Sequence, residues 1–201
     1  MKKYLLFLLS LIAGVFVWSA IKPADYFTWM LEVAPGAFTL IFIGILYYKK
    51  LKLTWLSYTI ITMLIIITFI GGHFTYDNVP WFTDLKEVFG WKRNPYDRFG
   101  HFLKGLLIIV FREVLLKETS LNKGAWLQIL SLSLVMTVAA CYEIIEFIAA
   151  KILGRSAEDF QGMQGDLWDS QWDMSLALAG SLLTLIILTK IHDKVLKRQI
   201  S

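Results

Sequence analysis

The stretch GDLWDSQWDMSLALAGSLLTLIIL, residues 165–188, places three aspartates directly before a long apolar run. Asp166, Asp169 and Asp173 are spaced three and four residues apart, so a helix that begins near Asp166 carries them on one face. Trp168 and Trp172 lie between them, and tryptophan is enriched at membrane–water interfaces. The pattern predicts a membrane helix whose first turns present a stripe of carboxylates.

The composition of the whole chain is that of a membrane protein. Of its 201 residues, 57% are hydrophobic and only 18% are charged, and the mean hydropathy is +0.59. A soluble domain is about half apolar, with about a quarter of its residues charged. The single cysteine, Cys141, excludes an internal disulfide framework and any CxxC metal or redox site. The basic residues are dispersed, so no nucleic acid partner is expected.

Six apolar runs are long enough to cross a hydrocarbon core of about 30 Å. Backbone groups in lipid must be satisfied within their own segment, so these runs are expected to be helices. We therefore predict an all-α integral membrane bundle of about six transmembrane helices, in a single multi-pass domain that covers residues 1–201. The expected helices lie near residues 4–21, 28–48, 54–73, 100–116, 126–153 and 174–192.

Three segments need separate comment. Cleavage after Ala20 would place Trp18 where a signal peptidase prefers a small residue, so the first run is expected to stay an uncleaved helix rather than act as a signal peptide. Residues 74–99 are rich in aromatics and prolines, which favours a segment lying in the interface. Near the inner end of the fourth run, Arg112 and Glu113 are expected to snorkel or to pair with each other.

The charges predict an orientation. With the N-terminus inside, the cytoplasmic segments hold more than half of the 20 Lys and Arg residues, in short stretches such as KKLK at 49–52. This is a positive-inside pattern, and it places both termini in the cytoplasm. Only Glu113, Glu118 and Asp193 of the 16 acidic residues then fall inside. The outer face is left with most of the carboxylates.

Four expected helices bring ionisable side chains to their outer ends. His73 ends the third helix, Asp97 and His101 begin the fourth, and Glu143 and Glu146 lie in the outer half of the fifth. Residues three or four apart share a helical face. The aspartate stripe begins the sixth helix. Ionisable groups in membrane segments usually face a cavity, pair with one another or serve function.

We therefore predict one polar site that opens to the outer face. Carboxylate and imidazole ligands together suit a divalent metal such as Zn, Mn or Fe. The candidate metal ligands are His101, Glu143, Glu146, Asp169 and Asp173, with His73 and Asp166 as further candidates. The candidate catalytic residues are Asp97, Arg98, His101, Glu143 and Glu146. Asp97 or Glu143 would be the acid/base group, and Arg98 would pair with a carboxylate or clamp a phosphate.

Structural readings of the same residues stay open. Aspartates at a helix start also cap it and interact favourably with its dipole. His73 also fits an interfacial histidine, and Asp97 with Arg98 a salt-bridged loop end. The glutamates of the fifth helix also fit buried partners of Arg98 or Lys104. The tryptophans at the outer face fit an aromatic belt.

Four motifs resemble the YjdF family of bacterial inner-membrane proteins: GGHFTYDNVP (71–80), FGWKRNPYDRFGHF (89–102), YEIIEF (142–147) and MQGDLWDSQWDM (163–174). The resemblance covers about residues 26–189 and implies a multi-pass protein of the cell inner membrane, without supplying a reaction. The sequence is also similar to the VanZ-like proteins, which are linked to glycopeptide tolerance and the cell envelope. In this chain the counterparts of the VanZ-like motif residues would be Asp97, His101, Glu143 or Glu146, and Asp169 or Asp173. The asparagine that is usual in the last VanZ-like motif is absent.

Three functions follow as hypotheses. The first is a metal-dependent or acid/base enzyme that acts on a lipid or cell-envelope precursor at the outer interface. The second is a cation or proton transporter, or an ion-binding protein, that uses the same carboxylates. The third is a structural envelope factor whose charged cluster holds helices together. The bilayer is the one partner that the sequence requires, and the oligomeric state stays open.

Overall fold

The computed structural model describes residues 1–153 and 166–200. Its long helices are α1 (Lys2–Ala20), α2 (Tyr26–Tyr48), α3 (Trp55–Phe74), α7 (Ala125–Leu153) and α8 (Asp169–Ile200). The shorter ones are η1 (Tyr76–Asn78), α4 (Pro80–Phe89), α5 (Tyr96–Lys104) and α6 (Leu107–Glu118). The described residues form no strand, which confirms the all-α prediction. Five of the helices in this part of the chain are long and apolar enough to cross a membrane: α1, α2, α3, α7 and α8.

Local sequence signals set several helix ends. The Asp25 carboxylate accepts a hydrogen bond of 2.6 Å from the Thr28 backbone N–H and caps α2. The Thr54 hydroxyl accepts one of 3.3 Å from the Ser57 N–H and caps α3. At its end, α4 stops at Gly90, whose φ of 64° is the left-handed conformation that glycine adopts without strain.

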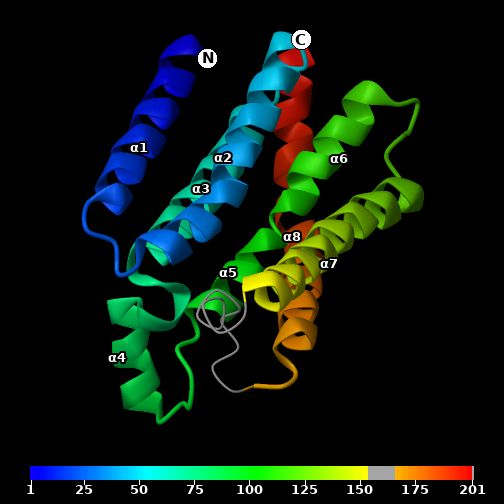
Figure 1. Cartoon of the computed structure of the whole chain (residues 1–201). Coiled ribbons are helices and arrows are strands. Elements are labelled where there is room, and N and C mark those ends of the chain that lie inside the picture. Colours follow the sequence, from blue (N-terminus) through cyan, green and yellow to red (C-terminus); the bar gives the residue numbers. More distant parts are fainter. Residues whose placement is uncertain (154–165, 201) are drawn as a thin grey trace.

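The fourth expected span, near residues 100–116, is not one continuous helix. It is divided into α5 and α6 by a tight turn in which the Gly105 N–H donates to the Phe102 carbonyl and the Leu106 N–H to the Leu103 carbonyl. Figure 1 shows the two termini at the same end of the molecule, with α5 and α6 together running from the opposite end back toward it. The broken pair therefore makes the crossing that an even number of spans requires.

The break lies where α5 meets α8. A Cβ atom added to Gly105 would overlap the backbone of Gly180 and Ser181, and one added to Gly180 would overlap the Phe102 carbonyl. The two helices thus touch through their backbones, as small residues permit in membrane bundles. This contact joins the end of α5 to the outer half of α8, and so it helps to position the polar groups of both helices.

The remaining helices pack around α3, α6 and α8. Both α1 and α2 lie against α3, while α7 lies against α6 and α8. The buried apolar core combines Leu8, Ile12, Val33, Ile61, Ile65, Phe69, Ile108, Ile109 and Val135. Outside it, many large apolar side chains are exposed, for example Phe7, Phe38 and Ile186 at 62%, 70% and 78%. A surface of this kind is expected for helices that face lipid.

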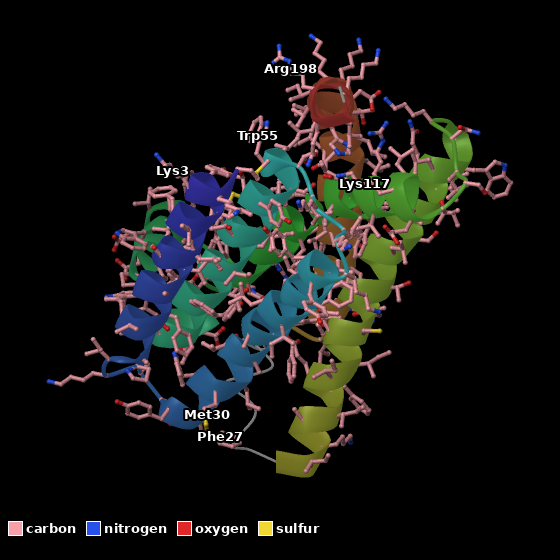
Figure 2. All side chains as sticks on the ribbon, turned by 90° about the horizontal axis from the view of Figure 1, so that it is seen from above. Lys3, Phe27, Met30, Trp55, Lys117 and Arg198 are labelled. Carbon is pink, nitrogen blue, oxygen red and sulfur yellow. The ribbon has the colours of Figure 1, made fainter. Side chains whose placement is uncertain are left out.

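The charged side chains distinguish the two ends of the bundle. Lys3 near the start of α1 and Arg198 near the end of α8 lie at the end of the molecule that holds both termini (Figure 1). Figure 2 is seen from above this end and labels both residues together with Lys117 near the end of α6. By the positive-inside rule, this end is the cytoplasmic one. The helix α8 continues past its expected end at residue 192 because its polar tail, rich in Lys and Arg, stays helical beyond the apolar run.

At the opposite, outer end, α4 occupies the segment that was expected to lie in the interface. Its apolar residues Trp81, Leu85, Val88 and Phe89 are all exposed. Their spacing of four, three and one residues puts them on one side of the helix. This face suits contact with the outer surface of the membrane that the protein spans, as the composition of residues 74–99 indicates.

The backbone contact predicts a position-dependent effect of alanine. Gly180→Ala adds a methyl group that α5 has no room for, so it should lower the free energy of unfolding by about 1–3 kcal/mol. Gly14→Ala is the control, because nothing lies within 4 Å of a Cβ at Gly14. Alanine there should be neutral or stabilise by up to about 1 kcal/mol through helix propensity. Thermal unfolding in detergent measures both, and equal melting of the two variants would contradict the close contact.

Candidate functional site

The sequence-predicted groups of α5, α7 and α8 converge at the outer end of the bundle. We call Asp97, His101, Glu143, Asp169 and Asp173 the outer cluster. All five are buried, with exposures between 1% for His101 and 8% for Glu143. The His101 Nε2 atom lies 3.6 Å from an Asp97 oxygen and 3.7 Å from a Glu143 oxygen. Segments more than 70 residues apart in sequence therefore share one buried site.

Within the outer cluster, three residues lie close enough together to hold a metal ion. Asp97, His101 and Asp173 each offer one ligand atom, and these atoms all lie within 4.8 Å of one another. The set is one histidine and two carboxylates, a combination suited to Zn, Mn or Fe. It differs from the ligand set expected from sequence, because Asp97 was expected to be an acid/base group. It retains His101 and Asp173 from that set.

Several polar atoms of the outer cluster have no hydrogen-bond partner among the described residues. They are His101 Nδ1, Glu143 Oε1 and Asp173 Oδ1. Burying such an atom without a partner typically costs about 1–3 kcal/mol. Most buried polar atoms in native proteins are satisfied by protein, water or an ion. The two carboxylate oxygens thus indicate room for a cation or a hydrogen-bond donor, and His101 Nδ1 indicates room for a polar ligand.

Two arginines form ion pairs with Asp166 and Asp169, which are not in the candidate metal-binding set. Arg93 donates to Asp169 and lies 3.4 Å from Asp97. Arg98 lies 2.5 Å from an Asp166 oxygen and 4.0 Å from Asp169. Asp166 also accepts a hydrogen bond from the Trp168 backbone N–H. This hydrogen bond is the main reason that the pKa of the Asp166 carboxyl lies below its ordinary value, and the charge of Arg98 lowers it further. Asp166 and Asp169 therefore lie in ion pairs that join the segment before α5 and the first turn of α5 to the start of α8.

Lys104 places a positive charge inside the outer cluster. Its Nζ is 2.7 Å from His101 Nε2 and lies 3.7 Å from the centre of the Tyr142 ring. An ammonium group can only donate, so Nε2 is the acceptor and the proton of the neutral imidazole is on Nδ1. In the absence of a metal, the lysine thus fixes the tautomer and supplies a compensating charge, and a metal bound at Nε2 would displace this contact.

The other predicted residues lie as follows. Glu146 is three residues beyond Glu143 on α7 and is partly exposed. His73 does not join the outer cluster: its Nδ1 lies 3.1 Å from the Ser19 carbonyl, and its ring packs on Trp18 and Phe74. The Arg98 guanidinium lies 5.5 Å from the Trp172 ring, which is half exposed at the outer rim.

Sequence reasoning missed two charged residues near this site, Arg93 and Glu32, and expected Lys104 only as a partner of the α7 glutamates. Arg93 is four residues before Asp97, and Lys104 three after His101, so helical spacing could have placed both beside the cluster. Glu32 lies inside the apolar helix α2 and is 3% exposed, close to Gly72 of α3. A carboxylate in a membrane helix is itself a signal of a polar environment.

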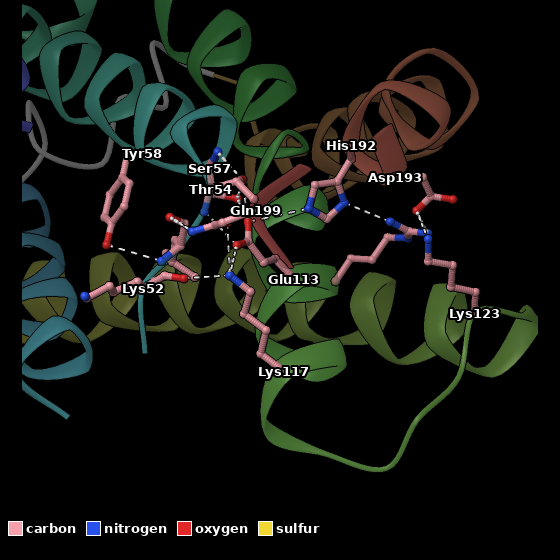
Figure 3. Close-up of polar contacts among 12 residues, drawn as sticks. Lys52, Thr54, Ser57, Tyr58, Glu113, Lys117, Lys123, His192, Asp193 and Gln199 are labelled. Carbon is pink, nitrogen blue, oxygen red and sulfur yellow. Dashed lines mark hydrogen bonds and ion pairs between the residues drawn. The ribbon is translucent and has the colours of Figure 1, made fainter. Parts of the chain in front are cut away.

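At the cytoplasmic end, a second polar network joins α3, α6 and α8 (Figure 3). We call it the inner network: Thr54, Ser57, Arg112, Glu113, Lys117, His192 and Asp193. The prediction that Arg112 and Glu113 snorkel or pair with each other was wrong. Both are buried, and Arg112 instead lies 2.8 Å from His192 Nδ1 and 2.8 Å from Asp193. Successive residues of one helix point in different directions, so each finds its own partners.

Glu113 is the centre of the inner network. One of its oxygens accepts from the Thr54 N–H at 2.6 Å and from Lys117 at 2.7 Å. The other accepts from the hydroxyls of Thr54 and Ser57, at 2.7 and 2.5 Å. His192 lies 3.5 Å away. A fully buried carboxylate with this many donors ties the start of α3 to α6.

Glu113→Ala should strongly destabilise the protein, because it removes a shared acceptor of the Thr54 N–H, of two hydroxyls and of Lys117. Breaking a buried pair from one side typically costs about 3–5 kcal/mol. Glu118→Ala is the control on the same helix, since Glu118 is exposed, and should change stability by less than about 0.5 kcal/mol. Thermal unfolding in detergent reads both, and a wild-type melting curve for Glu113→Ala would show that the network is not stabilising.

Comparisons with known proteins define the class of this chain. It belongs to the family described as "Predicted membrane protein (DUF2238)", whose sequence profile matches residues 4–194. It is 37% identical over 187 residues to the inner membrane protein YjdF of Escherichia coli (strain K12), across 92% of this chain and 88% of that protein. No solved structure matches the chain. The protein is thus a multi-pass protein of the inner membrane, and the resemblance to the YjdF family is confirmed, whereas these matches add nothing for the VanZ-like similarity.

Proposed function

We propose that the protein is a metal-dependent enzyme of the outer face, with a divalent cation held by Asp97, His101 and Asp173. The observation that carries the proposal is the convergence of these three ligand atoms within 4.8 Å. Unpartnered carboxylate oxygens on Asp173 and Glu143 support it. So does the balance of charge, because carboxylates outnumber cationic side chains in the described part of the outer cluster, and crowded carboxylates repel unless a cation or protons intervene.

The surrounding residues suit chemistry on a lipid or envelope-precursor substrate. A bound metal would supply Lewis-acid polarisation of a substrate oxygen or an activated water. Glu143 is the proposed acid/base group, because it is buried beside His101 without being in the ligand set. Arg98 is the residue best placed to bind an anionic headgroup, since its side chain is 27% exposed beside Trp172.

One observation favours the structural alternative. The Lys104 ammonium already donates to the imidazole of His101 and could by itself balance part of the negative charge. In that case the outer cluster holds α5, α7 and α8 together without a metal. Transport has less support, because the buried hydroxyls of Ser131 and Ser181 donate to carbonyls of their own helices and offer no relay inward.

Metal analysis separates these functions. Protein purified in mild detergent and loaded with Zn²⁺, Mn²⁺ or Fe²⁺ should retain stoichiometric metal after desalting. His101→Gln and Asp173→Asn should lose it, by at least about tenfold in affinity. Asp84→Asn is the control, because Asp84 is an exposed aspartate on α4 at the same end of the bundle. Equal retention by Asp173→Asn and Asp84→Asn, or no retention by the wild type, would contradict the proposal.

Lys104→Met sharpens the comparison with the structural alternative. If a cation binds at His101, removing the neighbouring ammonium should raise metal affinity, and added metal should restore thermal stability. If Lys104 is itself the compensating cation, the variant should melt at a lower temperature and added metal should not rescue it. For the enzymatic step, mass spectrometry of a bacterial membrane lipid extract incubated with the protein should reveal a product that the Asp173→Asn variant does not form.

A further inference from the structure

An apolar groove lies in the cytoplasmic half of the bundle, whereas the outer cluster lies at the opposite end. It has a volume of about 380 Å³ and is bounded by α1, α2 and α3. Leu9 of α1, Ile43 of α2 and Ile61 of α3 are among its walls, and Lys2 stands at its end. α3 forms the floor, because both α1 and α2 pack on α3, and Tyr4 binds Thr59 of α3 at 2.6 Å.

The groove faces the cytoplasmic leaflet. Its lining residues come from the first half of α1 and the second half of α2, which run to the end of the molecule where the termini lie (Figure 1). Lys49 and Lys50 follow α2 at the same end. The groove therefore has apolar walls at the depth of lipid chains and a positive rim at the depth of headgroups.

We propose that this groove binds one acyl chain of an anionic phospholipid, whose headgroup contacts Lys2. A lipid chain gains no hydrophobic free energy by leaving the bilayer for an apolar groove, so selection must come from shape and from the headgroup charge. A basic residue near the membrane surface favours an anionic lipid by roughly fivefold. The proposal is independent of the function proposed for the outer cluster.

Gly44 keeps the groove open. It lines the groove, and nothing lies within 4 Å of a Cβ built on it. Glycine inside a helix is less stable than alanine by about 1 kcal/mol, so this glycine has no advantage for the helix itself. The absence of a side chain at this position leaves space that an acyl chain can occupy.

Filling the groove tests the proposal. Gly44→Leu should occupy the space without displacing backbone, and it should raise helix propensity, so the variant should fold. Gly14→Leu is the matched control, because Gly14 also has open space around it but does not line the groove. Native mass spectrometry of protein extracted from membranes that contain phosphatidylglycerol and phosphatidylethanolamine counts the retained lipid.

We expect Gly44→Leu to lose the retained phosphatidylglycerol and Gly14→Leu to keep it. Lys2→Gln should lower the retained ratio of phosphatidylglycerol to phosphatidylethanolamine about fivefold. Lys3→Gln removes the same charge from a position outside the groove and should keep the wild-type ratio. Retention of phosphatidylglycerol by Gly44→Leu at the level of Gly14→Leu would overturn the groove as its site. An unchanged ratio in Lys2→Gln would overturn the role of Lys2.

Discussion

The backbone contact between Gly105 and Gly180 is the constraint on which the rest of the structure depends. At this contact α5 and α8 touch without side chains between them, and the fourth crossing is broken at the same place. The close approach holds α5 against the outer half of α8. Asp97 and His101 thereby meet Asp173, although 72 or more residues separate them in the sequence. A larger residue at either glycine would separate the two halves of the outer cluster.

The carboxylates of the two polar clusters differ in how fully they are satisfied, although Arg112 Nε and His192 Nε2 of the inner network also lack a hydrogen-bond partner among the described residues. In the inner network, both oxygens of Glu113 accept hydrogen bonds from neighbouring helices, so the carboxylate acts as a structural tie. In the outer cluster, atoms of His101, Glu143 and Asp173 have no partner in the part of the chain that the structure describes. Unsatisfied buried groups lower stability and persist where they serve a ligand. This contrast is why function is proposed for the outer end and not for the inner one.

Much of this arrangement could be predicted from sequence, and the remainder has a physical reason. Apolar runs and interfacial tryptophans predicted the helices. The residue spacing predicted that Asp97 and His101 share one helical face and that Asp166, Asp169 and Asp173 share another. The broken fourth crossing could not be predicted, because the break coincides with a contact to Gly180 of a distant helix, which one sequence does not reveal. Residue spacing also does not predict that Asp169 pairs with Arg93 while Asp173 lies beside His101. Partners across helices depend on rotation about each helix axis, which one sequence does not fix.

The convergence of the segment before α5 with the start of α8 is tested most directly by a double-mutant cycle between Arg93 and Asp169. Thermal unfolding of Arg93→Gln, Asp169→Asn and the double variant gives the interaction free energy. Residues in direct contact show coupling of about 0.5–3 kcal/mol, whereas residues more than about 10 Å apart are additive. The account predicts coupling of at least about 1 kcal/mol, as for a buried ion pair. Strict additivity would mean that these segments do not meet and that the outer cluster is not formed.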